Sequence, residues 1–206
     1  MNHVQRRLEE VEVSADAVGE ALQCLLHTII FARWPTVVRP RDHQCTKFPG
    51  IAYASCGDVD INRKVNATTS TILDSLEPAG PDLQKGTVTL TFFKRRTSKV
   101  VFWAYEEKMV WEQWNIPVLV NTEVSADDQR RRLSAEERDQ HQRQREARCT
   151  ESLQQRVMEV LCLLNDGVEH VPPATESSHD FEISCAQQEQ REPLRTRVMT
   201  APSVVV

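Results

Sequence analysis

The chain of 206 residues has little of what most enzymes and membrane proteins need. It holds only 6 glycines, none in a phosphate-binding arrangement, and it lacks the G-x-S-x-G and His-Glu-x-x-His signatures of hydrolases and metalloproteases. No apolar run approaches the roughly 18 residues that a membrane-spanning helix requires, and residues 1–13 lack the apolar core of a secretory signal. We therefore expect a cytoplasmic protein with no catalytic residue, no cofactor and no transmembrane segment.

An excess of positive charge is also missing, because the net charge is −5. Binding to nucleic acid requires a basic face that neutralises phosphates, so no nucleic-acid partner is expected. The 6 cysteines have no tight spacing and are expected to be free thiols in a reducing compartment. His43, Cys45 and Cys56 come nearest to a metal-ligand pattern but lack a second close pair. No metal site is predicted, and a small zinc-binding interaction module stays the weaker alternative.

Hydrophobic periodicity predicts a mixture of helices and strands. The clearest helix follows Ser14, a candidate N-cap, and carries apolar residues at helical spacing from Val18 to Ile29. His27 lies among them and is interpreted as a histidine at the edge of the core rather than a ligand. The remaining elements are expected as strands at 8–13, 51–54, 58–65, 87–93, 114–121 and 181–185, and as helices at 66–77 and 126–165.

The densest aromatic stretch runs from residue 87 to residue 121 and contains three of the 4 tryptophans. Its two ends alternate apolar and polar residues, as half-buried strands do. Between them, the basic run Lys94–Lys99 is expected to form a turn that leads into Phe102 and Trp103. This aromatic pair either closes one end of the core or projects as a hydrophobic finger for a partner, since exposed aromatic residues beside charges often anchor interfaces.

Three segments in the same order resemble the autophagy-related protein 101 family. They are Val11–Arg33, the Trp-Glu-Gln-Trp string at Trp111–Trp114, and His170–Ser184, and the resemblance spans residues 8–185. That family is a HORMA-domain subunit of the autophagy-initiation kinase complex. The resemblance implies an α+β fold with a mixed or antiparallel sheet packed against about three helices, followed by a short irregular C-terminal segment. Residues 1–185 would form this single domain.

The resemblance also implies a function for the aromatic stretch. Members bind and stabilise the HORMA domain of autophagy-related protein 13 and recruit downstream autophagy factors through an exposed Trp-Phe finger. The matching residues here are Phe102 and Trp103, in reversed order, so Val101 and Tyr105 stay candidates to share the role. Trp111 and Trp114 are expected to form a structural aromatic cluster.

A non-enzymatic adaptor at the preautophagosomal structure is therefore expected, and peripheral association with the forming autophagosome stays open. The rival is a peptide-binding HORMA adaptor of the checkpoint type, which would need an ordered belt after residue 168. Residues 126–148 are nearly devoid of apolar side chains and are interpreted as a charged helical extension or loop. Residues 186–206 are expected to be a disordered tail.

Overall fold

A computed structural model describes residues 3–35, 38–100, 103–122, 135–173, 179–185 and 196–198. One mixed sheet is built around a long antiparallel hairpin of β6 (Leu83–Val100) and β7 (Trp103–Asn121). The other strands of this sheet are β1 (Val4–Arg7), β2 (Val11–Ser14), β5 (Glu77–Pro78), β8 (His179–Cys185) and β9 (Thr196–Val198). β1, β2 and β9 run parallel to β7, whereas β5 and β8 run antiparallel to β6.

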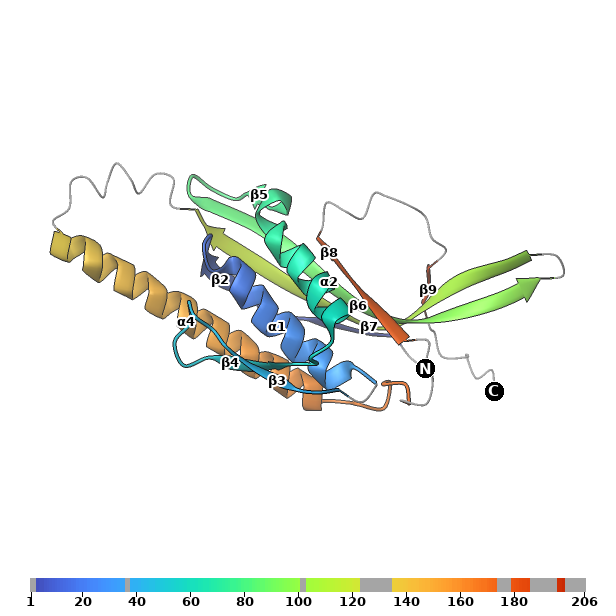
Figure 1. Cartoon of the computed structure of the whole chain (residues 1–206). Helices are drawn as coiled ribbons and strands as arrows, with labels where there is room; N and C mark the ends of the chain where they lie inside the picture. Colours follow the sequence, from blue (N-terminus) through green and yellow to red (C-terminus); the bar gives the residue numbers. More distant parts are fainter. Residues whose placement is uncertain are drawn as a thin grey trace, which may run out of the picture.

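Three α-helices accompany this sheet in the described part of the chain: α1 (Val18–Arg33), α2 (Val59–Ser70) and α4 (Ala135–Asn165). α1 packs against both other helices, and α4 also runs along β2 (Figure 1). A short 3-10 helix covers Ile72–Ser75, and β3 (Arg41–Gln44) pairs with β4 (Ala52–Ser55) in a separate two-stranded sheet beside α1. The α+β class with a mixed sheet and three helices is confirmed.

The core forms between α1 and the inner face of the hairpin. Leu22, Leu25 and Ile29 of α1 are fully buried, as their helical spacing predicts. Trp114, Ile116 and Val118 of β7 are equally buried, as their alternation predicts. One large apolar cluster therefore joins the best-predicted helix to the best-predicted strand.

Two boundaries near the N-terminal half differ from the sequence-based expectation. Ser14 ends β2 and its hydroxyl contacts the Asp16 carboxylate, so α1 begins at Val18 without a side-chain cap. Residues 58–65 were expected to be a strand, but they begin α2. The Asp58 carboxylate accepts hydrogen bonds from the backbone N–H groups of Asp60 and Ile61, which is an N-cap that makes helix the better state. The expected helix at 66–77 therefore begins earlier and ends at Ser70.

The predicted basic turn at Lys94–Lys99 is wrong, because these residues continue β6. Arg96 pairs with Glu107 and Thr97 with Glu106 across the hairpin. Arg96 and Glu107 place opposite charges on facing positions, which stabilises this pair of the hairpin.

The ends of the molecule carry the remaining differences. α4 extends past the sheet at one end, and residues 123–134 lie outside the described residues (Figure 1). Residues 196–198 form β9 on the edge of β7, so backbone pairing orders at least this part of the segment expected to be disordered. None of the described helices is long and apolar enough to cross a membrane.

Candidate interaction surfaces

A two-stranded arm projects from the sheet at the end opposite the α4 extension (Figure 1). It consists of β6 beyond Lys94, where β8 ends, and β7 before Lys108, where β9 begins. Val100 pairs with Trp103 at its end. The arm therefore carries the start of β7, and with it Trp103 and Tyr105, away from the body of the domain. Val101 and Phe102 lie outside the described residues.

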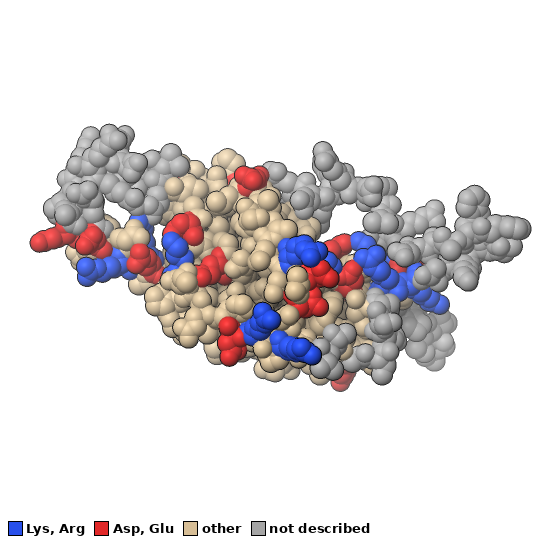
Figure 2. Space-filling model, viewed as in Figure 1, with Lys and Arg blue, Asp and Glu red and all other residues tan. Residues whose placement is uncertain are grey.

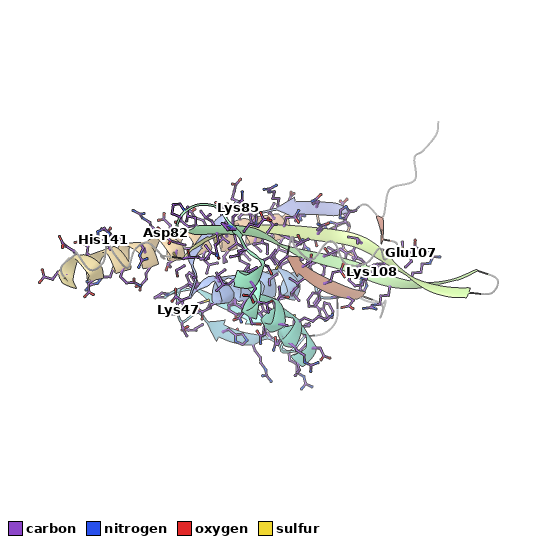
Figure 3. The ribbon with its side chains drawn as sticks, turned by 90° about the horizontal axis from the view of Figure 1, so that it is seen from above. Lys47, Asp82, Lys85, Glu107, Lys108 and His141 are labelled. Carbon is purple, nitrogen blue, oxygen red and sulfur yellow. The ribbon has the colours of Figure 1, made fainter. Side chains whose placement is uncertain are left out.

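Salt bridges neutralise much of the charge at the base of the arm. Asp180 of β8 binds both Lys64 and Arg95, at 2.6 and 2.7 Å, and Glu182 binds Lys108. Burial opposes the charge of Asp180, but hydrogen bonds from Lys64, Arg95 and the Phe181 amide outweigh it and hold the pKa of this carboxyl below its usual value. Glu107 and Lys108 are adjacent at this base (Figure 3), and basic and acidic side chains alternate over the visible described surface (Figure 2). The basic side chains Lys64, Arg95 and Lys108 at the base of the arm are therefore paired with carboxylates.

Phe93 lies beneath these charges on the sheet. Its ring is 1% exposed, and Arg95 and Lys108 lie over it at 5.6 and 4.8 Å from the centroid. Such cation–π contacts cover an aromatic ring that lies outside the main apolar cluster. The basic residues therefore have a packing role as well as their ionic one.

Trp111 and Trp114 are both buried in the core, at 1% and 0% exposure. The Trp111 ring packs against Phe92 and His170, with centroids 5.2 and 6.1 Å apart. Trp114 instead lies under the Arg6 guanidinium, which is 5.5 Å from its ring centroid. The two rings belong to one apolar cluster but have different neighbours, and both are buried within the domain.

Between the two tryptophans, the side chain of Glu112 is completely buried. Its Oε1 accepts from Nε of Arg6 at 3.0 Å, and its Oε2 accepts from Nε of Arg33 at 2.7 Å. Nη2 of Arg33 also donates to the Leu164 carbonyl at the end of α4, and Nη2 of Arg6 donates to the Asp166 carbonyl. Two guanidinium groups thus compensate one carboxylate and the negative end of a helix.

Sequence reasoning gave Glu112 and Arg33 no role, although both carried a detectable signal. Glu112 occupies an apolar position in the alternation that continues through Trp114 and Ile116. Arg33 falls on the buried face of α1, at helical spacing from Ile29. A charged residue in phase with a buried stripe indicates a buried ion pair, because an unpaired charge would not be tolerated there.

α4 presents a small apolar surface near its end. Met158 and Leu161 are 56% and 41% exposed, and Val168 just beyond the helix is 57% exposed. Positions three residues apart lie on one side of a helix, so the two helical residues form a short stripe. Exposed apolar side chains on a helix can serve as part of a contact surface for another protein.

A groove of 660 Å³ with a mixed polar and apolar lining lies between α4 and the loop at residues 46–49. Glu20 of α1 holds this loop by accepting from the backbone N–H groups of Thr46 and Lys47. Arg143 and Glu146 of α4 form part of the opposite wall, while His141 lies farther out on the α4 extension (Figure 3). Charges of both signs line the groove, which gives it no clear ligand class.

The weaker zinc alternative finds no support in the geometry. In the part of the chain that the structure describes, no three His, Cys, Asp or Glu side chains gather as a metal site. His43 instead stacks on Tyr53 at 5.1 Å, and Tyr53 stacks on His27 at 5.6 Å. Burial, assisted by His43, lowers the pKa of His27 to about 4, so this side chain is a neutral core residue.

Together, the fold and these surfaces define a small α+β domain with a projecting arm, an apolar helix stripe and a core fixed by buried ion pairs. The family profile described as autophagy-related protein 101 matches residues 10–178. Autophagy-related protein 101 of Arabidopsis thaliana is 27% identical over 191 residues, which cover 89% of this chain and 87% of that protein. The chain belongs to the autophagy-related protein 101 family, and its role is in autophagy.

Proposed function

We propose that this α+β domain is a HORMA domain that acts as a non-enzymatic adaptor in autophagy initiation. One surface binds and stabilises the HORMA domain of autophagy-related protein 13, and a second recruits downstream autophagy factors to the initiation kinase complex. The protein would act in the cytoplasm at the preautophagosomal structure. The observation that carries the proposal is the projecting arm, because it takes an aromatic segment away from the core in a chain of this family.

The arm supports the recruiting surface through its architecture. Aromatic residues are common anchors of interfaces, since they bury a large area with few rotatable bonds. Phe102 and Trp103 adjoin the position where β6 ends, and Tyr105 follows Trp103 by two residues, the spacing of one strand face. We propose Phe102 and Trp103 as the finger, with Val101 and Tyr105 as further contacts.

The experiment on the finger compares two double variants. Phe102→Ala with Trp103→Ala should abolish capture of downstream autophagy factors from cell extract while the melting temperature stays within about 2 °C of wild type. The matched control, Arg96→Ala with Glu107→Ala, alters a charge pair on the same arm and should keep capture. A melting temperature lowered by about 10 °C or more in the aromatic variant would place the rings in the core and overturn the finger.

The apolar stripe on α4 supports the other surface. Met158 and Leu161 are exposed on the part of α4 that the core anchors through Val160 and Leu164, so they are held on a rigid element. A partner of similar size with its own helical face could bury both residues and stabilise its native state through binding. We propose this stripe as part of the surface for the partner HORMA domain.

Substitution of the stripe tests this assignment. Met158→Glu with Leu161→Glu should prevent co-elution with the partner HORMA domain and leave the circular dichroism spectrum unchanged. Gln144→Glu, at an exposed position of α4 far from the stripe, should co-elute as wild type does. Co-elution of the double glutamate variant at the wild-type level would remove the stripe from the interface.

A further inference from the structure

A β-bulge lies in the hairpin just inside the base of the arm. Phe92 pairs with Glu112, but the next residue, Phe93, pairs with Val110, so Trp111 is an extra residue in β7. A bulge of this kind bends its strand and increases the local twist. β1 begins to pair with β7 at Glu112 on one side of the bulge, whereas β9 pairs with Lys108–Val110 on the other side, and the arm begins beyond that pairing.

Both residues at the bulge are fixed by neighbours from other elements. Trp111 packs against Phe92 of β6, His170 after α4 and the edge of His179 in β8. Glu112 is bound by Arg6 of β1 and Arg33 of α1. The bend is therefore held on one side by aromatic packing and on the other by two buried ion pairs.

The ion pairs also tie the bulge to the end of α4. Each of the two arginines donates to a carbonyl at or just after the helix end, Leu164 or Asp166. His170 Nε2 lies 3.4 Å from Oε1 of Glu112. β1, α1 and the end of α4 with the stretch after it thus surround Glu112 and fix the strand segment that leads to the arm.

We infer that Trp111 and Glu112 are positioning residues for the arm, because the bulge that they hold sets the direction in which the arm presents its aromatic end. The inference rests on the proposed recruiting function of that end. Neither side chain reaches the partner surface, since both are buried. Their effect on recruitment is exerted through the arm's direction, which a two-stranded hairpin alone would not fix.

Deletion of Trp111 tests the bulge without changing the strand register. Phe92 would still pair with Glu112 and Phe93 with Val110, so the hairpin would keep its pairs and lose the bend. Trp111→Phe is the matched control, because it keeps both the extra residue and a ring. Glu112→Gln keeps the bulge but removes the charge that binds the two guanidinium groups.

The direction of the arm is measured as the distance between two spin labels by pulsed electron spin resonance. The labels are attached to a genetically encoded keto amino acid, so that the 6 cysteines stay native. One label replaces Ser98 on the arm, and the second replaces Ala67 on α2 or Gln155 on α4, both exposed positions. Wild type and Trp111→Phe should give one narrow distribution of label-to-label distances for each pair of labelled positions. Deletion of Trp111 should shift both mean distances by more than the wild-type width, and Glu112→Gln should broaden both distributions.

A broad distribution in wild type would overturn the inference, and this outcome does not depend on any variant folding. Unchanged distances in both the deletion and Glu112→Gln would also overturn it. If the fraction of correctly directed arms falls to a tenth, capture of downstream factors should weaken about tenfold. Trp103→Ala should lose capture with unchanged distances. A Trp103→Ala variant that still captures downstream factors would contradict the proposed recruiting role of the finger. The label-to-label distances test the positioning role of Trp111 and Glu112 separately, because they are measured without any partner.

Discussion

Oε2 of Glu112 accepts a 2.7 Å hydrogen bond from Nε of Arg33, which joins the middle of β7 to the last turn of α1. The two residues are far apart in sequence, and both side chains are almost completely withdrawn from solvent. A buried pair of this kind restricts the structure more than it stabilises it, because desolvation of the charges offsets most of their attraction. Removal of only one partner lowers stability, because the other charge then stays buried without compensation.

Replacement of Glu112 by alanine should lower the free energy of unfolding by about 3–5 kcal/mol, since Arg6 and Arg33 would stay buried without their carboxylate. Denaturation in urea, monitored by tryptophan fluorescence, measures this change. Asp60→Ala breaks an exposed pair with Arg63, whose side chains are 78% and 72% exposed, and should change stability by less than about 1 kcal/mol. A similarly small effect of Glu112→Ala would mean that the buried pairs are not maintained in solution.

His27 should make stability depend on pH in a window below neutrality. Its pKa is about 4 in the folded protein against the ordinary 6.5, so the unfolded chain binds more protons between these values. Stability should be full above pH 6.5 and fall by on the order of 3 kcal/mol as the pH decreases toward 4. His27→Phe, which preserves a ring beside Tyr53, should remove this contribution in urea melts from pH 4 to 7. If the stability of the variant depends on pH as that of wild type does, His27 is not the neutral buried group that causes this dependence.

Asp180 should contribute to the pH dependence of stability in a lower pH range than His27. The pKa of Asp180 in the folded protein is depressed, whereas the unfolded carboxyl has the ordinary pKa of 3.8. The stabilisation is present above that value and is lost as the pH falls through the lower folded pKa. Asp180→Asn should therefore be less stable than wild type at pH 6, and the difference should shrink at pH 2. Thermal melts at the two pH values measure this, and a difference that grows on acidification would refute the assignment.

Asp58→Ala should destabilise the domain by about 1 kcal/mol, because it removes the cap that accepts two backbone N–H groups of α2. The comparison variant is Ser14→Ala, at the residue first expected to cap α1. The Ser14 hydroxyl donates a hydrogen bond to the exposed Asp16 carboxylate and not to the helix backbone, so this substitution should have a smaller effect. Equal losses in urea unfolding of the two variants would contradict the capping role of Asp58.

Local patterns predicted the elements whose burial is continuous along the chain. The spacing from Val18 to Ile29 predicted α1, and the alternation from Trp114 to Val120 predicted the body of β7. The segment from Asp58 was misassigned because its β-branched residues Val59, Ile61 and Val65 fit a strand, while a single capping carboxylate decides for helix. The hydrogen bonds from the backbone N–H groups of Asp60 and Ile61 to the Asp58 carboxylate favour helix at this point.

The arm could not be predicted from the basic run because its stability depends on cross-strand partners. Lys94–Lys99 reads as a turn when taken alone, but along its whole length it pairs with the segment from Ala104 to Met109 of β7. The Glu112 cluster was missed for a related reason. Its members come from β1, α1 and β7, and their meeting is a property of the topology rather than of any local window.

The adaptor proposal is tested most directly by co-expression of this chain with the HORMA domain of autophagy-related protein 13 from the same organism. Size-exclusion chromatography with light scattering then measures the mass of the product. We predict a single one-to-one complex that persists on dilution to micromolar concentration. Two separate peaks, each with the mass of a free chain, would contradict the account.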